Sequence, residues 1–233
     1  MENNVDLSVV IPAYNEAENL RELLPRMNAA LKREGIAFEI LVVDRTTKTD
    51  DTPEICAGSE AGYLNRQNSD LFGNAVRTGI KFCKGRYVLF MDADGSHPPE
   101  FVTELYKYRN EADVVVASRY VNGGGTENPR VLILMSRFLN LIYSVVLNIP
   151  CKDVSNSFKL YRRELLADLK LYCDNFDIVE EILFKIVENN PGTKIKEIPF
   201  NFEKRKFGVT KRNLFTFIIS FAITLFKLRF GLK

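Results

Sequence analysis

The sequence RYVLFMDADGSHPPE, residues 86–100, joins an apolar run to two aspartates and a loop rich in turn residues. The apolar part predicts a buried strand, and Asp92 and Asp94 follow where that strand should end. A period of two places both carboxylates on one side of an extended backbone, where they repel each other unless a cation lies between them. Carboxylates and water are ligands that Mg²⁺ and Mn²⁺ accept. The alternative interpretation is a plain turn, because Asp, Gly and Pro are common turn residues.

The composition is that of a globular protein with a core. The 233 residues, 46% of them apolar and 27% charged, are enough for one large α/β domain or two small ones. A net charge of +2 gives no indication of a nucleic-acid partner. The four cysteines form no CxxC pair, which argues against a zinc site and favours a reduced cytosolic protein. The acidic, polar start MENNVD is unlike a signal peptide. His97 is the single histidine, so a Ser–His or Cys–His catalytic pair could form only there.

Strand-like apolar runs alternate with amphipathic segments through the first half of the chain. We expect strands at Leu7–Ile11, Phe38–Val43, Gly62–Asn65, the run before Asp92 and Ala112–Ala117. We expect helices from a cap at Asn15 to Gly35, after Pro53, over Gly73–Lys84 and from Pro98 onward. This alternation predicts βαβ units and a mostly parallel sheet.

Three of the predicted strands end in residues suited to a ligand site. Pro12, Asp44 and Asp92 each stand at the carboxyl end of a strand. In parallel sheets the binding crevice lies at these carboxyl ends, so we expect the three residues to converge. Their convergence favours a metal and ligand site over unrelated turns.

The pattern changes after Tyr120. A glycine-rich loop at 122–126 precedes an apolar helix expected over Val131–Leu147, and a late strand is expected over Lys194–Phe200. A basic cluster follows at Lys204, Arg205, Lys206, Lys211 and Arg212. With no linker or repeat in the sequence, we expect one catalytic domain over residues 1–212 and a separate helix over 213–233.

Several motifs stand in an order that resembles glycosyltransferase family 2. They are SVVIPAYNE at 8–16, VD at 43–44, DAD at 92–94 with HPPE at 97–100, and SRY at 118–120 with the glycine loop. Later segments resemble the polyprenyl (dolichyl) phosphate mannosyltransferase branch of this family. They are DVSNSF at 153–158 with YRR at 161–163, KEIP at 196–199, and Arg205 with GVTK at 208–211.

The resemblance implies a GT-A fold, an α/β fold with a Rossmann-like, mixed and mostly parallel sheet, and it implies a nucleotide-diphosphate sugar as donor. By position, the donor would be held by Pro12, Tyr14, Glu16, Asp44, Gly73, Asp92, Ala93 and Asp94. A divalent cation, Mg²⁺ or Mn²⁺, would be held by Asp92, Asp94 and Ser96. The diphosphate and the acceptor phosphate would be held by Arg119, Arg130, Arg137, Arg205 and Lys211. The expected catalytic residues are Asp92, Asp94, Arg119 and Arg205.

The expected reaction is an inverting transfer of a hexose to a polyprenyl phosphate, with mannose from GDP-mannose as the first expectation. A cation on the aspartates would neutralise charge on the leaving diphosphate. A phosphate acceptor is already an anionic nucleophile and needs arginines rather than a base. The alternative acceptor, a glycan hydroxyl, would require a carboxylate base. The candidates for that base are Asp153, Glu180 and Glu181, of which the two glutamates are more simply read as ordinary helix acids.

The sequence departs from the family pattern at three places. Arg45 follows Asp44 where a second aspartate is common and reverses the charge beside the nucleobase pocket. Leu71 stands where a glycine is common, and NSFK at 156–159 replaces the commoner SGFR. Arg45 and Leu71 motivate a further alternative, a catalytically weak subunit that binds a nucleotide sugar. Because the pair Asp92 and Asp94 is intact, we still expect activity.

The segment from Leu214 to Phe226 is almost entirely apolar, with one narrow polar stripe and basic residues at both ends. It is well short of the ~20 residues that span a bilayer. We therefore expect an interfacial helix, or a docking face for a membrane-protein partner or a second copy. The alternative is a last helix packed on the domain. The expected location is peripheral, on the cytoplasmic face of a membrane.

Overall fold

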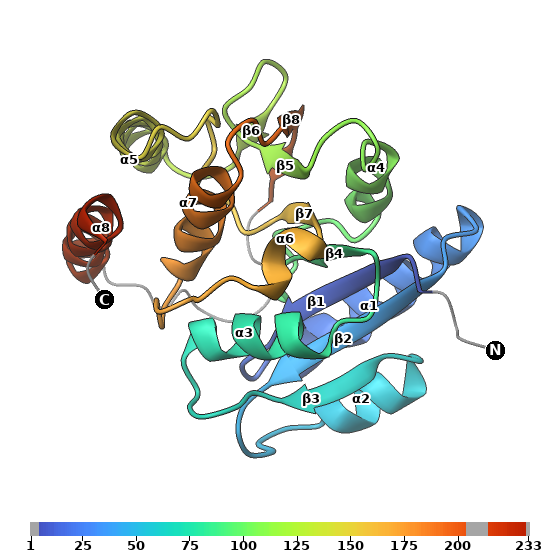
Figure 1. Cartoon of the computed structure of the whole chain (residues 1–233). Coiled ribbons are helices and arrows are strands. Elements are labelled where there is room, and N and C mark those ends of the chain that lie inside the picture. The colour runs from blue at the N-terminus through green and yellow to red at the C-terminus, as the bar shows by residue number, and fades with distance from the viewer. Residues whose placement is uncertain (1–4, 204–213, 232–233) are drawn as a thin grey trace.

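The computed structural model describes residues 5–203 and 214–231 (Figure 1). In chain order, the elements of its first half are β1 (Leu7–Pro12), α1 (Ala17–Arg33), β2 (Phe38–Asp44), α2 (Thr52–Gly58), β3 (Gly62–Asn65), α3 (Phe72–Phe82), β4 (Tyr87–Phe90), α4 (Phe101–Lys107) and β5 (Val114–Ser118). The second half holds β6 (Gly125–Thr126), α5 (Arg130–Val146), β7 (Lys159–Arg162), α6 (Glu164–Ala167), α7 (Ile178–Asn189), β8 (Ile195–Pro199), β9 (Asn201–Phe202) and α8 (Leu214–Phe230).

A seven-stranded sheet in the order β3-β2-β1-β4-β7-β5-β8 forms the centre of the molecule. Every neighbouring pair in it is parallel except the two pairs made by β7, which runs antiparallel between β4 and β5. The prediction of a mostly parallel α/β sheet is confirmed. Since β1, β2 and β4 are parallel neighbours, their carboxyl ends meet at one edge of the sheet.

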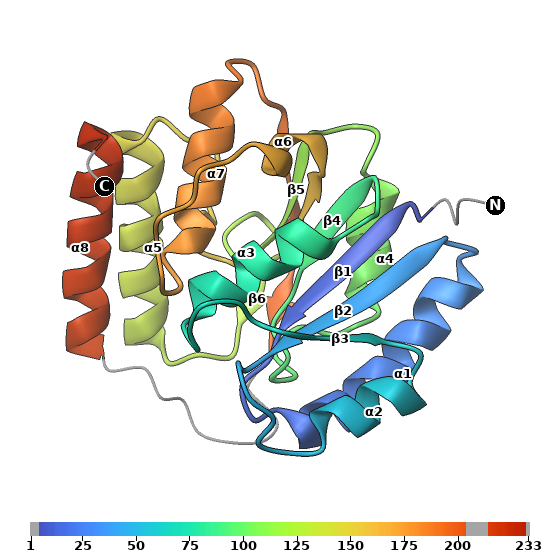
Figure 2. The same ribbon diagram turned by 60° about the horizontal axis from the view of Figure 1, so that its bottom comes forward.

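Helices cover both faces of this sheet (Figure 2). Residues on β1 alternate between the two sides, with Val9 and Ile11 in one core cluster and Val10 in the other. The first cluster takes side chains from α1, α2 and α4, and the second takes them from α3, α5, α7 and α8. Because both faces are buried, the strands read as continuous apolar runs rather than alternating ones.

Local details differ from the sequence expectations at the helix starts. The residue that precedes α1 is Glu16, not Asn15, which adopts a left-handed backbone with φ of 56°. Gly35 ends α1 as expected, also with positive φ. The glycine-rich loop is partly ordered into a strand, because β6 pairs with β9.

Among residues 5–203 and 214–231, no helix is both long and apolar enough to cross a membrane.

Candidate active site

The two predicted metal ligands lie in a tight turn directly after β4. Asp92 and Asp94 are half-buried, and Gly95 takes a φ of 80°, which lets the backbone reverse. The buried Ser96 donates twice to the Asp94 Oδ1, from its backbone N at 3.1 Å and from its Oγ at 2.5 Å. In this arrangement Ser96 orients the Asp94 carboxylate. Its predicted role as a metal ligand stays a prediction.

His97 packs beneath the loop that carries Asp92 and stabilises the same turn. Its ring is fully buried and stacks on Phe158 with 4.5 Å between centroids, and its Nδ1 accepts the backbone N–H of Asp92 at 3.0 Å. Burial lowers the pKa of His97, which favours the neutral imidazole that this acceptor role requires. His97 therefore positions the backbone of Asp92, and its contacts are not those of a Ser–His or Cys–His pair.

The carboxylate of Asp92 is held by a neutral donor. The Ser157 Oγ donates to its Oδ1 at 2.9 Å, and Asp92 forms no ion pair with any residue in the described ranges. Within those same ranges, no group of three or more acidic, histidine or cysteine side chains could hold a metal by itself. Two carboxylates completed by water and substrate phosphate are the usual protein contribution to a Mg²⁺ site. The donor set of Asp92 and Asp94 thus fits a cation that binds together with a diphosphate.

Asp44 provides a third acidic group at the same edge of the sheet, at the end of β2. It is fully buried, and its Oδ2 accepts the Tyr63 hydroxyl at 3.3 Å. Its Oδ1 has no hydrogen-bond partner among the described residues. Burial raises the pKa of this carboxyl. A buried acceptor without a protein donor is suited to a ligand that brings one, as a nucleoside does.

The ends of β1 and β2 are joined by Arg66, a residue that the sequence reasoning missed. Arg66 is only 5% exposed, and its guanidinium donates to the carbonyls of Ala13 and Asp44, to the latter at 3.1 Å. Pro12, the last residue of β1, directly precedes Ala13, whose carbonyl Arg66 contacts. Nothing near Arg66 in the sequence signals the role, because its partners come from two other strands.

Arg45 is part of a neutral cluster. Its Nε donates to Asp70 at 3.1 Å, and its guanidinium lies 4.5 Å from the ring centre of Tyr14. The Thr46 N–H also donates to Asp70, at 2.7 Å. The positive charge that Arg45 brings to this position is therefore balanced by the carboxylate of Asp70, beside the ring of Tyr14. Glu16, also predicted to hold the donor, accepts a hydrogen bond from the Asn19 side chain beside the start of α1.

Gly73 has a packing reason of its own. Its N–H donates to the Asp174 carbonyl at 2.7 Å, and a Cβ at this position would meet the Cys173 carbonyl oxygen at 2.3 Å. Leu71, the departure from the family pattern, precedes α3 and is 43% exposed. The role of Gly73 in donor binding stays a prediction, as does that of Ala93, which is buried between Asp92 and Asp94.

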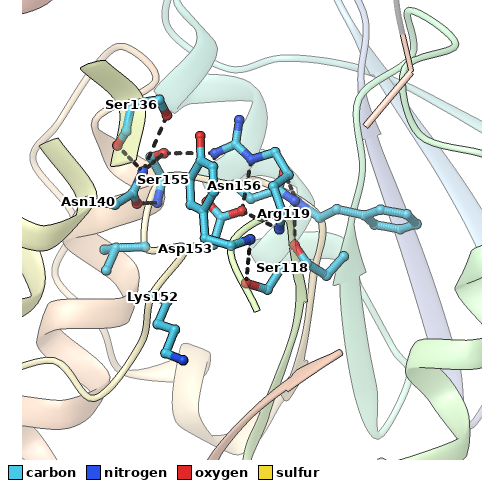
Figure 3. A network of polar contacts seen from close by, with 12 residues as sticks. Ser118, Arg119, Ser136, Asn140, Lys152, Asp153, Ser155 and Asn156 are labelled. Atoms are coloured by element: carbon cyan, nitrogen blue, oxygen red, sulfur yellow. Dashed lines mark hydrogen bonds and ion pairs between the residues drawn. The ribbon is translucent and has the colours of Figure 1, made fainter. Parts of the chain in front are cut away.

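Arg119 and Asp153 form a buried ion pair beyond the end of β5, seen in Figure 3. The Arg119 backbone N and Nε donate to one Asp153 oxygen at 2.8 Å, and its Nη2 donates to the other at 2.6 Å. The Asp153 side chain is fully buried, and that of Arg119 is 12% exposed. Burial opposes the charge on Arg119, but Asp153 outweighs it and raises the Arg119 pKa above its usual range. Arg119 is thus anchored by Asp153.

This ion pair connects to the middle of α5. The Arg119 Nη2 reaches the Ser155 Oγ at 3.2 Å, and Asn140 exchanges two hydrogen bonds with Ser155, at 2.9 and 3.0 Å (Figure 3). Asn140 is 1% exposed, and it also donates to the Ser136 carbonyl at 2.8 Å. A polar network therefore links the end of β5 to a helix that is otherwise strongly apolar.

Two of the remaining predicted cations are less enclosed than Arg119. Arg130 and Arg137 lie exposed on α5, and the Arg137 guanidinium is 5.4 Å from the ring centre of Tyr120. Arg205 and Lys211 lie outside the described residues.

The three acids considered as a catalytic base are all buried. Asp153 is occupied by Arg119, as described above. Glu181 is 1% exposed, accepts the backbone N–H groups of Tyr172 and Cys173, and pairs with Lys185 at 2.7 Å. Glu180, beside it on α7, is 5% exposed. None of the three presents an open carboxylate to an incoming hydroxyl.

Comparisons with known proteins identify the family to which the chain belongs. Residues 8–170 match the family model described as Glycosyl transferase family 2. The chain is 34% identical over 217 residues to a dolichol-phosphate mannosyltransferase of Pyrococcus furiosus, which covers 88% of this chain and 58% of the relative. It is 31% identical over 220 residues to a polyprenol monophosphomannose synthase of Mycolicibacterium smegmatis, which covers 87% of this chain and 79% of the relative. This chain therefore spans little more than half the length of the Pyrococcus protein.

Solved structures confirm the fold. A glucosyl-3-phosphoglycerate synthase of Mycobacterium tuberculosis, crystallised with Mn²⁺, UDP and phosphoglyceric acid, aligns with a TM-score of 0.73 at 20% identity. The alignment covers 98% of this chain and 79% of that one. The same enzyme with Mg²⁺ and UDP also aligns with a TM-score of 0.73, at 21% identity and over 98% and 80% of the two chains. The predicted GT-A architecture is thus confirmed.

Proposed function

The chain belongs to glycosyl transferase family 2, and from that premise we propose that it transfers a hexose from a nucleotide-diphosphate sugar to a polyprenyl phosphate, with inversion. The names of the two relatives support mannose as the sugar, and we propose GDP-mannose as its donor. The observation that carries the proposal is the contrast among the site's acids. Asp92 and Asp94 stand half-buried after β4, while every acid considered as a base is buried in the fold.

The choice of acceptor follows from that contrast. A sugar hydroxyl must lose a proton as it attacks, and Asp153 cannot take it while both its oxygens accept from Arg119. A phosphate monoester is anionic already and needs only to be held by cations. Arg205 and Lys211 are proposed for that task, together with Arg130 and Arg137 at the start and middle of α5.

We place the donor along the edge formed by β1, β2 and β4. Asp44 would take hydrogen bonds from the nucleoside at its unpartnered Oδ1, with Tyr14 and the Arg45–Asp70 pair as a wall. A divalent cation held by Asp92 and Asp94 would neutralise the charge that develops on the leaving diphosphate. His97 and Ser157 hold Asp92 in place before any ligand arrives, so little reorganisation is needed at the reacting centre.

The direct test is product formation by the purified protein from polyprenyl phosphate and GDP-mannose with Mg²⁺ or Mn²⁺. We expect a mannosyl lipid, loss of turnover with a chelator, and recovery when the metal is restored. Transfer to a soluble glycan with the lipid phosphate inert would support the alternative acceptor. Nucleotide binding by calorimetry with no turnover on any acceptor would instead support a binding subunit.

A donor screen by thermal shift identifies the nucleotide independently of the acceptor. GDP-mannose, UDP-glucose and UDP-N-acetylglucosamine are compared in the presence of Mn²⁺. The correct donor at 100 times its Kd should stabilise the protein by about 2.7 kcal/mol. A uridine donor that stabilises while GDP-mannose does not would correct the proposed nucleobase.

We further propose that the protein works peripherally at a membrane, since a polyprenyl chain does not leave the bilayer, and that it does so on the cytoplasmic face. Asp177 accepts a hydrogen bond from the Thr224 Oγ at 2.7 Å, so one face of α8 packs on the domain. The predicted separation of residues 213–233 as a membrane or docking helix stays a prediction.

A further inference from the structure

Helix α5 carries a row of large apolar side chains that no described part of the protein covers. Val131, Leu134, Phe138, Leu141 and Val145 are between 59% and 70% exposed. Their spacing of three and four residues places them on one side of the helix. The opposite side holds Asn140 and Tyr143, both buried. An exposed apolar row of this length on a folded domain indicates an interaction surface.

Helix α8 lies beside α5 in both views (Figures 1 and 2). The Tyr143 and Phe221 rings meet edge to face between them, with centroids 4.4 Å apart. On its outer side α8 presents Ile223, Phe226 and Phe230, which are 51%, 57% and 63% exposed. The two outer rows together are called the α5–α8 face below. The two helices that carry it form one flank of the molecule (Figure 2).

The charges on these two helices are all of one sign. Neither α5 nor α8 contains an aspartate or a glutamate, whereas Arg130, Arg137, Lys227 and Arg229 are exposed cations. By the helical repeat, Lys227 and Arg229 lie on opposite sides of the apolar row of α8. Apolar side chains edged by cations match the boundary between the acyl chains and the headgroups of an anionic membrane.

We propose that the α5–α8 face docks on the surface of a bilayer that contains anionic phospholipids. A second copy of the chain suits the face less well, because it would bring like charges together with no carboxylate between them. The proposed membrane surface thus includes α5 as well as α8. Its biological purpose rests on the proposed function, transfer to a lipid acceptor. The inner side of α5 reaches Arg119 through Asn140 and Ser155, so docking would place the bilayer next to the site that uses a lipid acceptor.

Vesicle flotation without donor or acceptor tests the surface separately from the reaction. We expect the full chain to float with vesicles made of equal parts phosphatidylglycerol and phosphatidylcholine, and to float much less with phosphatidylcholine alone. The Phe138→Ser, Phe226→Ser variant should bind the mixed vesicles at least tenfold more weakly, because two large apolar side chains no longer enter the interface. The Lys227→Gln, Arg229→Gln variant should lose about fivefold per cation and much of its dependence on the anionic lipid.

The matched control is Phe82→Ser, which removes an exposed phenylalanine from α3, away from the α5–α8 face, where it is 41% exposed. It should bind vesicles as the unaltered chain does. Failure of the unaltered chain to float, or equal binding by the Phe138→Ser, Phe226→Ser variant, overturns the proposal. A dimer in sedimentation velocity that becomes a monomer in that variant, without vesicle binding, would assign the face to a second copy. Vesicle binding by a protein that transfers no sugar would overturn the proposed function and leave the surface standing.

Discussion

Asp92 and Asp153 are two aspartates of one site region whose surroundings differ in kind. Asp92 follows β4, is half-buried, and accepts one hydrogen bond from a serine, with no ion pair among the described residues. Asp153 precedes β7, is fully buried, and is bonded through both oxygens to Arg119. One carboxylate keeps its charge available to a ligand, whereas the charge of the other is already neutralised by the protein.

The difference shows how to separate a functional acid from a structural one. A neutral donor such as Ser157 orients a carboxylate without cancelling its charge, so the carboxylate can still attract a cation. A buried guanidinium cancels that charge, and removing either member of such a pair leaves an uncompensated ion in the core. The predicted consequences therefore differ, with activity depending on Asp92 and stability on Asp153.

The largest expected effect comes from the Asp92→Asn, Asp94→Asn variant. The substitution should lower kcat for sugar transfer by about 10³-fold or more, because charge on the leaving diphosphate would no longer be neutralised. Folding free energy from urea unfolding should change by less than about 0.5 kcal/mol, since an amide keeps one acceptor oxygen for the Ser157 hydroxyl at position 92 and for the Ser96 hydroxyl at position 94. Full turnover by this variant would show that the pair is only a turn.

Asp153→Asn tests whether the buried ion pair with Arg119 stabilises the fold. It should destabilise the fold by about 3–5 kcal/mol in urea unfolding, because Arg119 would be left charged and buried. The double variant Arg119→Met, Asp153→Asn should recover part of that loss. A cost below about 1 kcal/mol for Asp153→Asn would contradict the anchoring of Arg119.

Asn140→Leu measures how far the structural network extends into α5. It removes the partners of the Ser155 N–H and Oγ, and we expect a loss of about 1–3 kcal/mol in urea unfolding. The matched control is Leu141→Ala on the exposed side of the same turn, which should cost less than about 0.5 kcal/mol in the absence of a membrane. Equal effects of the two substitutions would place Asn140 outside the network.

Asp44→Asn should give the smallest effect of the four substitutions. We expect it to raise the stability of the fold and to weaken nucleotide binding. Burial raises the Asp44 pKa, so the folded chain binds this proton more tightly than the unfolded chain, and stability falls as pH rises through the raised pKa. The variant should therefore melt a few degrees higher than the unaltered chain at neutral pH. The gain should shrink on acidification to about pH 4, where the unfolded-state carboxyl also takes up its proton.

The same variant should bind the nucleotide more weakly, because a neutral amide replaces the buried acceptor. Melting curves across the pH range and calorimetry with GDP-mannose measure the two effects. A melting temperature that drops at neutral pH would show that the Asp44 charge stabilises the fold.

Much of the fold could be predicted because it depends on neighbours in the chain. Apolar runs such as Leu7–Ile11 and Gly62–Asn65 appear as strands at the expected positions, and the glycine at 35 ends its helix. The short strand β7 and the helix α7 were not predicted. Both follow the loop that carries Asp153, and β7 is held by antiparallel pairing with β4 and β5. Pairing of this kind is a long-range property that a short window of sequence does not carry.

By itself, the sequence determined the strand ends and the pair at Asp92 and Asp94, because spacing along a strand and turn chemistry are local. The tertiary structure decided which charges are free to act. Asp153 meets Arg119 across 34 positions, and Arg45 meets Asp70 across 25. It also decided that the apolar row of α5 faces outward. Burial and ion pairing are set by which elements the sheet order brings together, and that order is established only when the whole chain folds.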